Sequence, residues 1–286
     1  MVIWLSGIGA VMALLGLIVG VWLYSPVARR YRFPSGVSSV PYAGQKRWHT
    51  ILGLLFGLVT CTWAFSGMLS LSPFEWLSGR RANASLPAAL HSPRVPIGAF
   101  TEAPHILPGA KEVEFAALAG TPVYLETIAG RPEVISIDGR RHTGLDPVLV
   151  RRIAGQVVAP YRVEEFRIVR NYEAYYLDRH HERPLPVIFI RLNDPERSMY
   201  YVDPRTGRTA QSYAGSSRIN RWLYHGLHSL DLPWLYTHRP AWDLIVLSLM
   251  AGGTALCVTS MVIAWRRLRH KLRMFRMRRT MVKAAA

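Results

Sequence analysis

Acidic residues are missing from both ends of this chain. Its 286 residues carry 35 Lys and Arg against 18 Asp and Glu, and every acid lies within residues 74–243. Charge of either sign is absent from residues 1–28 and 49–73, whereas five bases lie in residues 25–49 and nine in residues 266–286. Basic segments that flank long uncharged runs are typical of membrane topology signals. Because most of the net charge of +17 lies in such flanking segments, we interpret it as a topology signal and expect no nucleic-acid partner.

Cysteine is scarce, and several cofactor motifs are missing. The two cysteines, Cys61 and Cys257, both lie in apolar runs, so we expect packing residues and no disulfide framework. Outside those runs there is no Gly-rich dinucleotide or phosphate loop, no paired-Cys zinc spacing and no nucleophile elbow. The sequence thus predicts no NAD, flavin or zinc cofactor. Any electron donor would be external.

Three apolar runs are long enough to cross a bilayer, because about 20 residues at roughly 1.5 Å each span its hydrocarbon core. They predict transmembrane helices at residues 1–24, 50–72 and 243–265. Charge follows the first run instead of preceding it, which favours an uncleaved span over a signal peptide. If the basic loop 25–49 and the basic tail 266–286 are cytoplasmic, the N-terminus lies outside. The run begins one residue after Met1, so the natural protein could extend upstream.

The region between the second and third spans carries the pattern of a mixed α and β domain. Residues 73–110, rich in Ala, Ser and Pro, predict a linker with little structure. Asp146 and Pro147 predict the N-cap and first position of a helix that runs to about Val158. Short apolar or alternating runs predict strands at 111–117, 122–128, 134–137, 163–169, 186–192 and 198–202. The domain should therefore cover residues 111–215, followed by an aromatic and His-rich interface segment at 216–242.

Three stretches carry a resemblance to a known family. They are KRWHTILGLLFGLVTCTWAFSGMLSL at 46–71, YYVDPRTGR at 200–208 and RWLYHGLHSLDLPWLYTHRPAWD at 221–243. They resemble the His-led helix, the end of the PepSY domain and the returning helix of the PepSY-associated transmembrane family of bacterial inner-membrane proteins. The resemblance implies a membrane α-helical fold, with about three transmembrane helices and an inserted periplasmic α+β PepSY-like domain.

The resemblance also implies a function. Family members with an assigned activity are haem-binding reductases that help to release iron from ferric siderophores at the periplasmic side. This implies haem b, with His49 and His228 as iron ligands and His225 as a neighbour. Because members commonly have four or more spans, it also implies additional membrane helices or a homo-oligomer as partners, beside the lipid bilayer.

The spacing of the histidines limits which of them could bind one haem iron together. Haem in membrane cytochromes usually takes two axial imidazoles from facing helices at one depth. On the inner side, His49 and His270 form an uneven pair. On the outer side, His225 and His228 are three apart on one helical face, so they cannot easily be opposite ligands of one iron. An outer partner would come from His180, His181, His238, another subunit or missing sequence. The alternative is that these histidines are interfacial residues or helix caps.

Other charged groups have two interpretations each. Arg221 and Arg239 flank the outer histidines and could pair with haem propionates, or simply anchor the interface. The run Asp178–Arg183 could hold a metal or an anion, but is more typical of a solvated loop. The basic tail, interleaved with apolar residues, should lie on anionic headgroups.

Two functions remain open. In the first, the protein carries haem and reduces ferric iron or a ferric siderophore at the periplasmic face. In the second, it is a non-catalytic anchor whose exported domain binds a peptide, a peptidase or another envelope partner.

Overall fold

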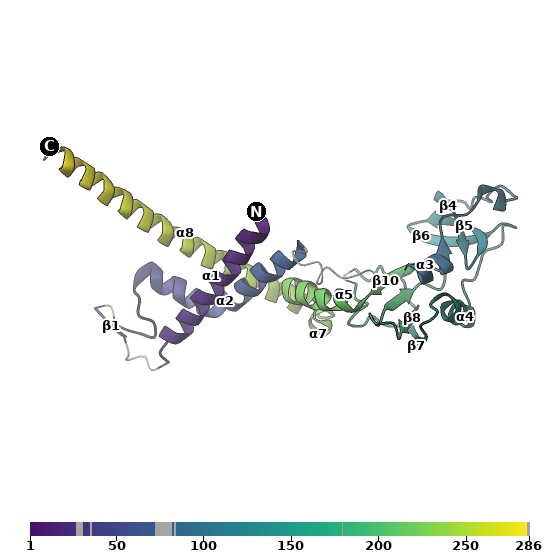
Figure 1. The fold of residues 1–286 in the computed structure, drawn as a ribbon, viewed down its shortest axis with the longest axis horizontal. Helices are drawn as coiled ribbons and strands as arrows, with labels where there is room; N and C mark the ends of the chain where they lie inside the picture. Colours follow the sequence, from purple (N-terminus) through teal and green to yellow (C-terminus); the bar gives the residue numbers. More distant parts are fainter. Residues whose placement is uncertain (27–30, 35, 72–81, 83, 179, 285–286) are drawn as a thin grey trace. The chain divides into compact units, whose positions relative to one another are not determined.

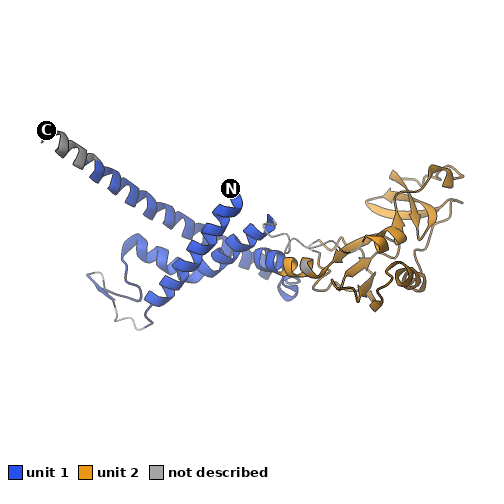
Figure 2. Cartoon of the chain, in the orientation of Figure 1, with its two compact units in different colours: residues 1–73, 223–286 blue, residues 74–222 orange. Residues whose placement is uncertain are grey.

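The computed structural model describes residues 1–26, 31–34, 36–71, 82, 84–178 and 180–284 (Figure 1). The chain divides into two compact units (Figure 2). The first, which we call the membrane unit, comprises residues 1–73 and 223–286. The second, the inserted domain, comprises residues 74–222.

The membrane unit is built on three long helices, α1 (Val2–Leu23), α2 (Gly44–Ser70) and α8 (Arg239–Ala284). Among the described residues, three helical segments are long and apolar enough to cross a membrane, namely Val2–Leu23, Gly44–Ser70 and Arg239–Phe275. The predicted number of spans is therefore confirmed by length and composition.

Helix α2 packs against both other long helices, and glycines allow the close approach. At the α2–α8 contact, a Cβ atom added to Gly252 would lie 2.4 Å from the ring of Phe56, so only glycine fits there. At the α1–α2 contact, a Cβ atom on Gly57 would lie 3.5 Å from Leu17. Cys61 donates to the carbonyl oxygen of Ala10 at 3.5 Å. These contacts make α2 the centre of the membrane unit.

The helices extend beyond the predicted spans. Helix α2 begins at Gly44 and so includes the last bases of the predicted loop, while residues 31–33 and 36–38 of that loop pair as strands β1 (Tyr31–Phe33) and β2 (Gly36–Ser38). Helix α8 continues through the predicted tail to Ala284, which gives it a total length of 46 residues, or about 69 Å. Residues 266–284 contain no Gly or Pro and many Arg, Leu and Met, which favours continuation of the helix.

Short helical elements precede α8. They are α5 (Gly215–Asn220), the π-helical turn η2 (Arg221–Gly226), α6 (Leu227–Ser229) and α7 (Pro233–Tyr236). Helix α6 ends at Leu230, which has a φ of +52°. The predicted interface segment 216–242 is thus a series of short turns.

The inserted domain contains two antiparallel four-stranded sheets. One has the order β3-β4-β5-β6 and the other β10-β9-β8-β7. Their strands are β3 (His91–Ser92), β4 (Ala110–Leu118), β5 (Thr121–Ile128), β6 (Arg131–Ser136), β7 (Val163–Val169), β8 (Val187–Leu192), β9 (Met199–Val202) and β10 (Thr209–Tyr213). All six predicted strands are confirmed as β4 to β9. Strands β3 and β10 were not predicted.

Helix α4 (Pro147–Val157) begins as the sequence predicts. The carboxylate of Asp146 accepts a hydrogen bond from the backbone N–H of Val148 at 2.9 Å, and Pro147 takes the first helical position. Val150 and Ala154 on its inner face are fully buried in the main core, which both sheets share. The N-cap signal and the apolar spacing therefore specified this helix.

Residues 73–81 and 83 of the predicted linker 73–110 lie outside the described residues, and the described remainder contains regular structure. Helix α3 (Ser85–Leu90) and the 3₁₀ turn η1 (Ile97–Ala99) lie in this segment. Leu86 and Leu90 are fully buried in the main core, beside residues of both sheets. The Ala, Ser and Pro composition concealed two apolar anchors whose partners are distant in sequence.

Candidate functional sites

His49 lies on the first turns of α2 and is held by a residue of α8. Its Nδ1 is 3.0 Å from Oγ1 of Thr259, and that hydroxyl donates to the carbonyl oxygen of Leu256 at 2.8 Å. When the Thr259 hydroxyl donates to Leu256 it can accept from Nδ1–H, and in that tautomer of His49 the Nε2 lone pair is available. Nε2 has no hydrogen-bond partner among the described residues.

A cavity of about 660 Å³ adjoins His49 between α1, α2 and α8. Its walls are mainly apolar side chains and the glycines of α1 and α2. Lys46 and Arg267 also line it, beside Tyr42. The cavity thus combines an imidazole, an apolar interior and two cations, and its volume is within the range of cofactor sites.

His228 has the same arrangement at the other end of α2. Its Nδ1 is 3.1 Å from Oγ of Ser66, which donates to the carbonyl oxygen of Trp63 at 3.3 Å. Tyr224 stacks on the imidazole, with ring centroids 5.2 Å apart and an interplanar angle of 21°. The indole of Trp63 lies 6.4 Å away, and its buried Nε1 has no partner among the described residues. An unused donor therefore lies beside a second oriented imidazole.

The two histidines occupy different depths. His49 and Ser66 are 17 residues apart on one helix, or about 26 Å. His270, on an exposed part of α8, is 11 residues beyond Thr259, or about 16 Å along the axis. The structure thus does not bring His49 together with His228 or with His270.

The other predicted residues have local partners. His225 is exposed, and its Nδ1 lies 3.7 Å from the carboxylate of Asp231, so it differs from His228 in its surroundings. Arg239 pairs with Asp243 at 3.3 Å and lies over the ring of Trp242. Arg221 belongs to the inserted domain, where it is buried against the ring of Trp222. His238 binds the carbonyl oxygen of Trp234 at 2.6 Å.

The charged loop 178–183 is organised by its own first residue. The carboxylate of Asp178 accepts backbone N–H groups from His180, Glu182 and Arg183 at 3.3, 2.6 and 2.7 Å. Burial raises the pKa of Asp178, but these hydrogen bonds outweigh it and leave the pKa below its ordinary value. No cluster of three or more His, Cys, Asp or Glu that could hold a metal occurs in the described part of the chain.

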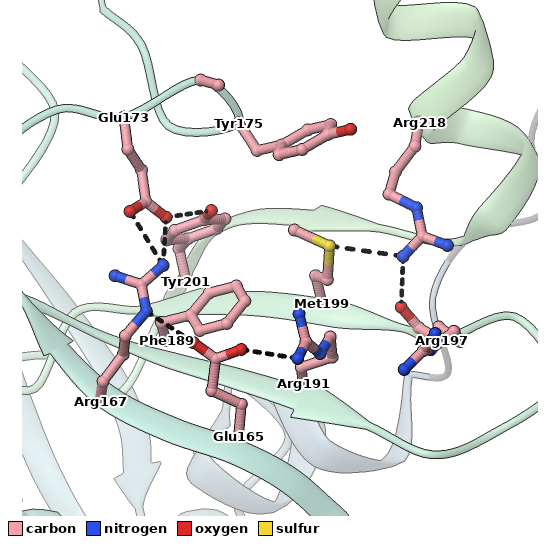
Figure 3. Close-up of a pocket in the computed structure, with 11 residues that line it drawn as sticks. Glu165, Arg167, Glu173, Tyr175, Phe189, Arg191, Arg197, Met199, Tyr201 and Arg218 are labelled. Atoms are coloured by element: carbon pink, nitrogen blue, oxygen red, sulfur yellow. Dashed lines mark hydrogen bonds and ion pairs between the residues drawn. The ribbon is translucent and has the colours of Figure 1, made fainter.

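A second cavity, of about 630 Å³, lies in the inserted domain on one face of the sheet β10-β9-β8-β7 (Figure 3). We call it the arginine cleft. Its floor comes from alternate strand residues, which share one face: Glu165 and Arg167 of β7, Phe189 and Arg191 of β8, and Met199 and Tyr201 of β9. Glu173, Tyr175, Arg197 and Arg218 complete it. The intervening strand residues, such as Ile188, Ile190 and Tyr200, face the main core.

Ion pairs cross the floor of the arginine cleft in an alternating series. Arg167 pairs with Glu173 at 2.8 Å and with Glu165 at 2.9 Å. Arg191 pairs with Glu165 at 2.8 Å and with Glu164 at 3.2 Å. Arg197 closes the series on Glu164 at 2.7 Å, and this hydrogen bond lowers the pKa of Glu164.

Tyr201 ties the series to the sheet. Its hydroxyl donates to Glu173 at 2.6 Å. Burial raises the pKa of Tyr201, and the bond to Glu173 raises it further. The phenol therefore remains a donor at neutral pH.

Sequence reasoning missed the arginine cleft. Its residues lie on strands that were correctly predicted, and the alternation of charged residues at 165, 167 and 191 with apolar neighbours was visible. The strand pattern does not indicate a cleft, because the covering residues Tyr175 and Arg218 come from a loop and from α5. Nothing in the strand pattern predicts those two.

A family model described as the PepSY-associated TM region matches residues 46–284. No curated protein and no solved structure shows a significant match.

Proposed function

Because the chain belongs to the family of the PepSY-associated TM region, we propose that it is a haem-binding electron-transfer protein of the bacterial inner membrane. In this proposal it reduces ferric iron or a ferric siderophore at the periplasmic face. The supporting observation is that both His49 and His228 have Nδ1 held by a hydroxyl, with Nε2 unused by described residues.

Among the described residues, His49 and His228 would each offer one imidazole nitrogen to the iron of such a group, at two separate positions. Histidines that bind metals commonly donate their other N–H to a neighbouring acceptor, which fixes the tautomer and the ring orientation. Thr259 and Ser66 supply such acceptors here. At the inner position the adjoining cavity offers apolar walls, with Lys46 and Arg267 available for carboxylates of the group. At the outer position Trp63 offers an unused N–H.

Haem, when bound, supplies one-electron chemistry. The chain contributes orientation and depth. Ser66 and Thr259 fix the imidazole planes, and the apolar helix faces exclude water. A separation of about 26 Å along α2 is close to the roughly 30 Å thickness of the hydrocarbon core, so the two positions lie near opposite surfaces. Any further residue that holds the group at either position would come from another copy or another membrane subunit, and electrons would come from an external donor.

The test is the haem content of the purified full-length protein, read from the Soret band and the reduced-minus-oxidised spectrum. His49→Gln and His228→Gln should each remove about half of the haem per protein, because the positions are separate. His238→Gln, which alters a histidine bound to the carbonyl of Trp234, is the matched control and should keep all of it.

The readout also distinguishes the alternative function. Retention of haem and spectrum by both variants would refute the ligand assignment. A parent protein that takes up no haem would favour the non-catalytic anchor, whose inserted domain binds an envelope partner.

A further inference from the structure

The arginine cleft has the features of a small-molecule site that is independent of haem. All of its lining residues lie in the inserted domain, between positions 165 and 218. A volume of about 630 Å³ falls within the range of small-ligand sites. The floor is set by three adjacent strands and its ion pairs, so the shape is largely preformed.

Three of the four arginines that line the cleft are held in ion pairs. Arg167, Arg191 and Arg197 are matched by the carboxylates of Glu164, Glu165 and Glu173. Arg218 is the fourth arginine, and no carboxylate lies within ion-pair distance of it among the described residues. The guanidinium of Arg218 donates instead to the carbonyl oxygen of Arg197 at 2.7 Å and to the sulfur of Met199 at 3.4 Å.

Glu196 contacts Arg218 through its backbone and not through its carboxylate. Glu196 accepts from the backbone N–H of Gly215 at 3.0 Å, and only its main-chain oxygen meets Arg218. Arg218 is therefore the arginine of the cleft that takes part in no ion pair among the described residues. A guanidinium with spare donors recognises a carboxylate or a similar oxyanion.

Apolar surface lies beside this charge. Tyr175 and Arg218 lie above the floor of the cleft, with Met199 between them (Figure 3). The ring of Tyr175 is braced, since its hydroxyl accepts from Nε1 of Trp222 at 3.0 Å and its edge packs on Tyr213. Aromatic and thioether groups at a fixed spacing suit a flat apolar body.

From these contacts we infer that the arginine cleft binds a small monovalent organic anion with a planar apolar body. The anionic group pairs with Arg218, and the body lies between Tyr175 and Met199. This site goes beyond the proposed electron transfer and does not depend on it.

The test is calorimetric titration of the full-length protein in lipid nanodiscs with 2-naphthoate, with empty nanodiscs subtracted. The parent should bind naphthoate at one site, and the neutral 2-naphthamide at least tenfold more weakly. Arg218→Gln should weaken naphthoate at least tenfold and leave naphthamide almost unchanged. Tyr175→Ala should weaken both ligands, because it removes the apolar wall that they share.

Arg152→Gln is the control for loss of one charge. Arg152 is exposed on α4, which packs against the main core and does not line the cleft, so binding should remain as in the parent. Arg218→Lys keeps the positive charge and is the control for misfolding. It should bind naphthoate more tightly than Arg218→Gln does.

Three results would overturn the inference. They are no binding of naphthoate by the parent, equal affinity for acid and amide, or equal loss in Arg152→Gln. A peptide with a C-terminal Phe that binds tenfold more tightly than naphthoate would also overturn it, in favour of a peptide ligand.

Discussion

At the scale of single residues, the candidate sites depend on short polar contacts to residues that are distant in sequence. The imidazole of His228 is set by Ser66, and that of His49 by Thr259, 210 positions away. The sequence identified both histidines from their place beside apolar runs. It could not identify their partners, because Ser and Thr are common in membrane helices and the pairing depends on helix register.

Asp178 provides a test of a local network. Its three backbone N–H bonds favour the ionised carboxylate, so the folded pKa lies below the ordinary value of 3.8. We expect Asp178→Asn to destabilise the inserted domain by about 1–2 kcal/mol at pH 7, or roughly 4 °C in Tm. The ionised carboxylate of Asp178 stabilises the domain fully at a pH above its unfolded pKa. That stabilisation is lost as the pH falls through its folded pKa. The difference from the parent should therefore shrink below about pH 4.

Differential scanning calorimetry of the full-length protein from pH 7 to pH 3 measures this difference. Asp138→Asn is the control, because Asp138 accepts a single backbone N–H at 3.3 Å and pairs with the exposed Arg140. A difference for Asp178→Asn that is constant with pH would contradict the role of its charge.

At the scale of elements, regular alternation and capping signals predict the helices and strands that are specified by residues close in sequence. Strands β4 to β9 and helix α4 follow from local pattern, and so do the long apolar helices. Helix α3 does not, because a six-residue SLPAAL segment has weak helical propensity and gains its stability from tertiary burial. Strand β3 likewise exists only through its pairing with β4.

A fragment comparison tests the importance of α3. Residues 84–222 should fold alone with a cooperative thermal transition, whereas residues 105–222 should lack that transition or melt at least 15 °C lower. The reason is that the shorter fragment loses two fully buried leucines, Leu86 and Leu90. Each such loss costs about 2–5 kcal/mol, against a total stability of about 5–15 kcal/mol.

Circular dichroism at 222 nm on both fragments gives the transitions. In the longer fragment Leu90→Ala should lower the Tm strongly, while Ile97→Ala, at a site 83% exposed, should leave it unchanged. Equal stability of the two fragments would contradict a stabilising role of α3 and support the prediction that residues 73–110 are a linker.

At the scale of the whole molecule, charge and helix length together define a proposed orientation. The apolar part of α8 ends at Trp265, and a continuous helix carries the following bases out of the hydrocarbon core. The bases at the start of α2 likewise lie on the helix but outside its apolar run, in the other basic segment. Since positive flanks are retained on the cytoplasmic side, we propose that both basic segments belong there and that the inserted domain lies on the opposite side of the membrane.

Reporter insertion tests this orientation at positions that tolerate it. Gly36 is the exposed first residue of β2 in the β1–β2 hairpin, and Gly130 is an exposed turn residue of the β5–β6 hairpin. A reporter active only in the cytoplasm should be active after Gly36 and after Ala286, and silent after Gly130. Alkaline phosphatase, which is active only outside the cytoplasm, should give the opposite pattern. Activity of the cytoplasmic reporter at Gly130 would place the arginine cleft inside the cell, and the proposed reduction at the periplasmic face would fail with it.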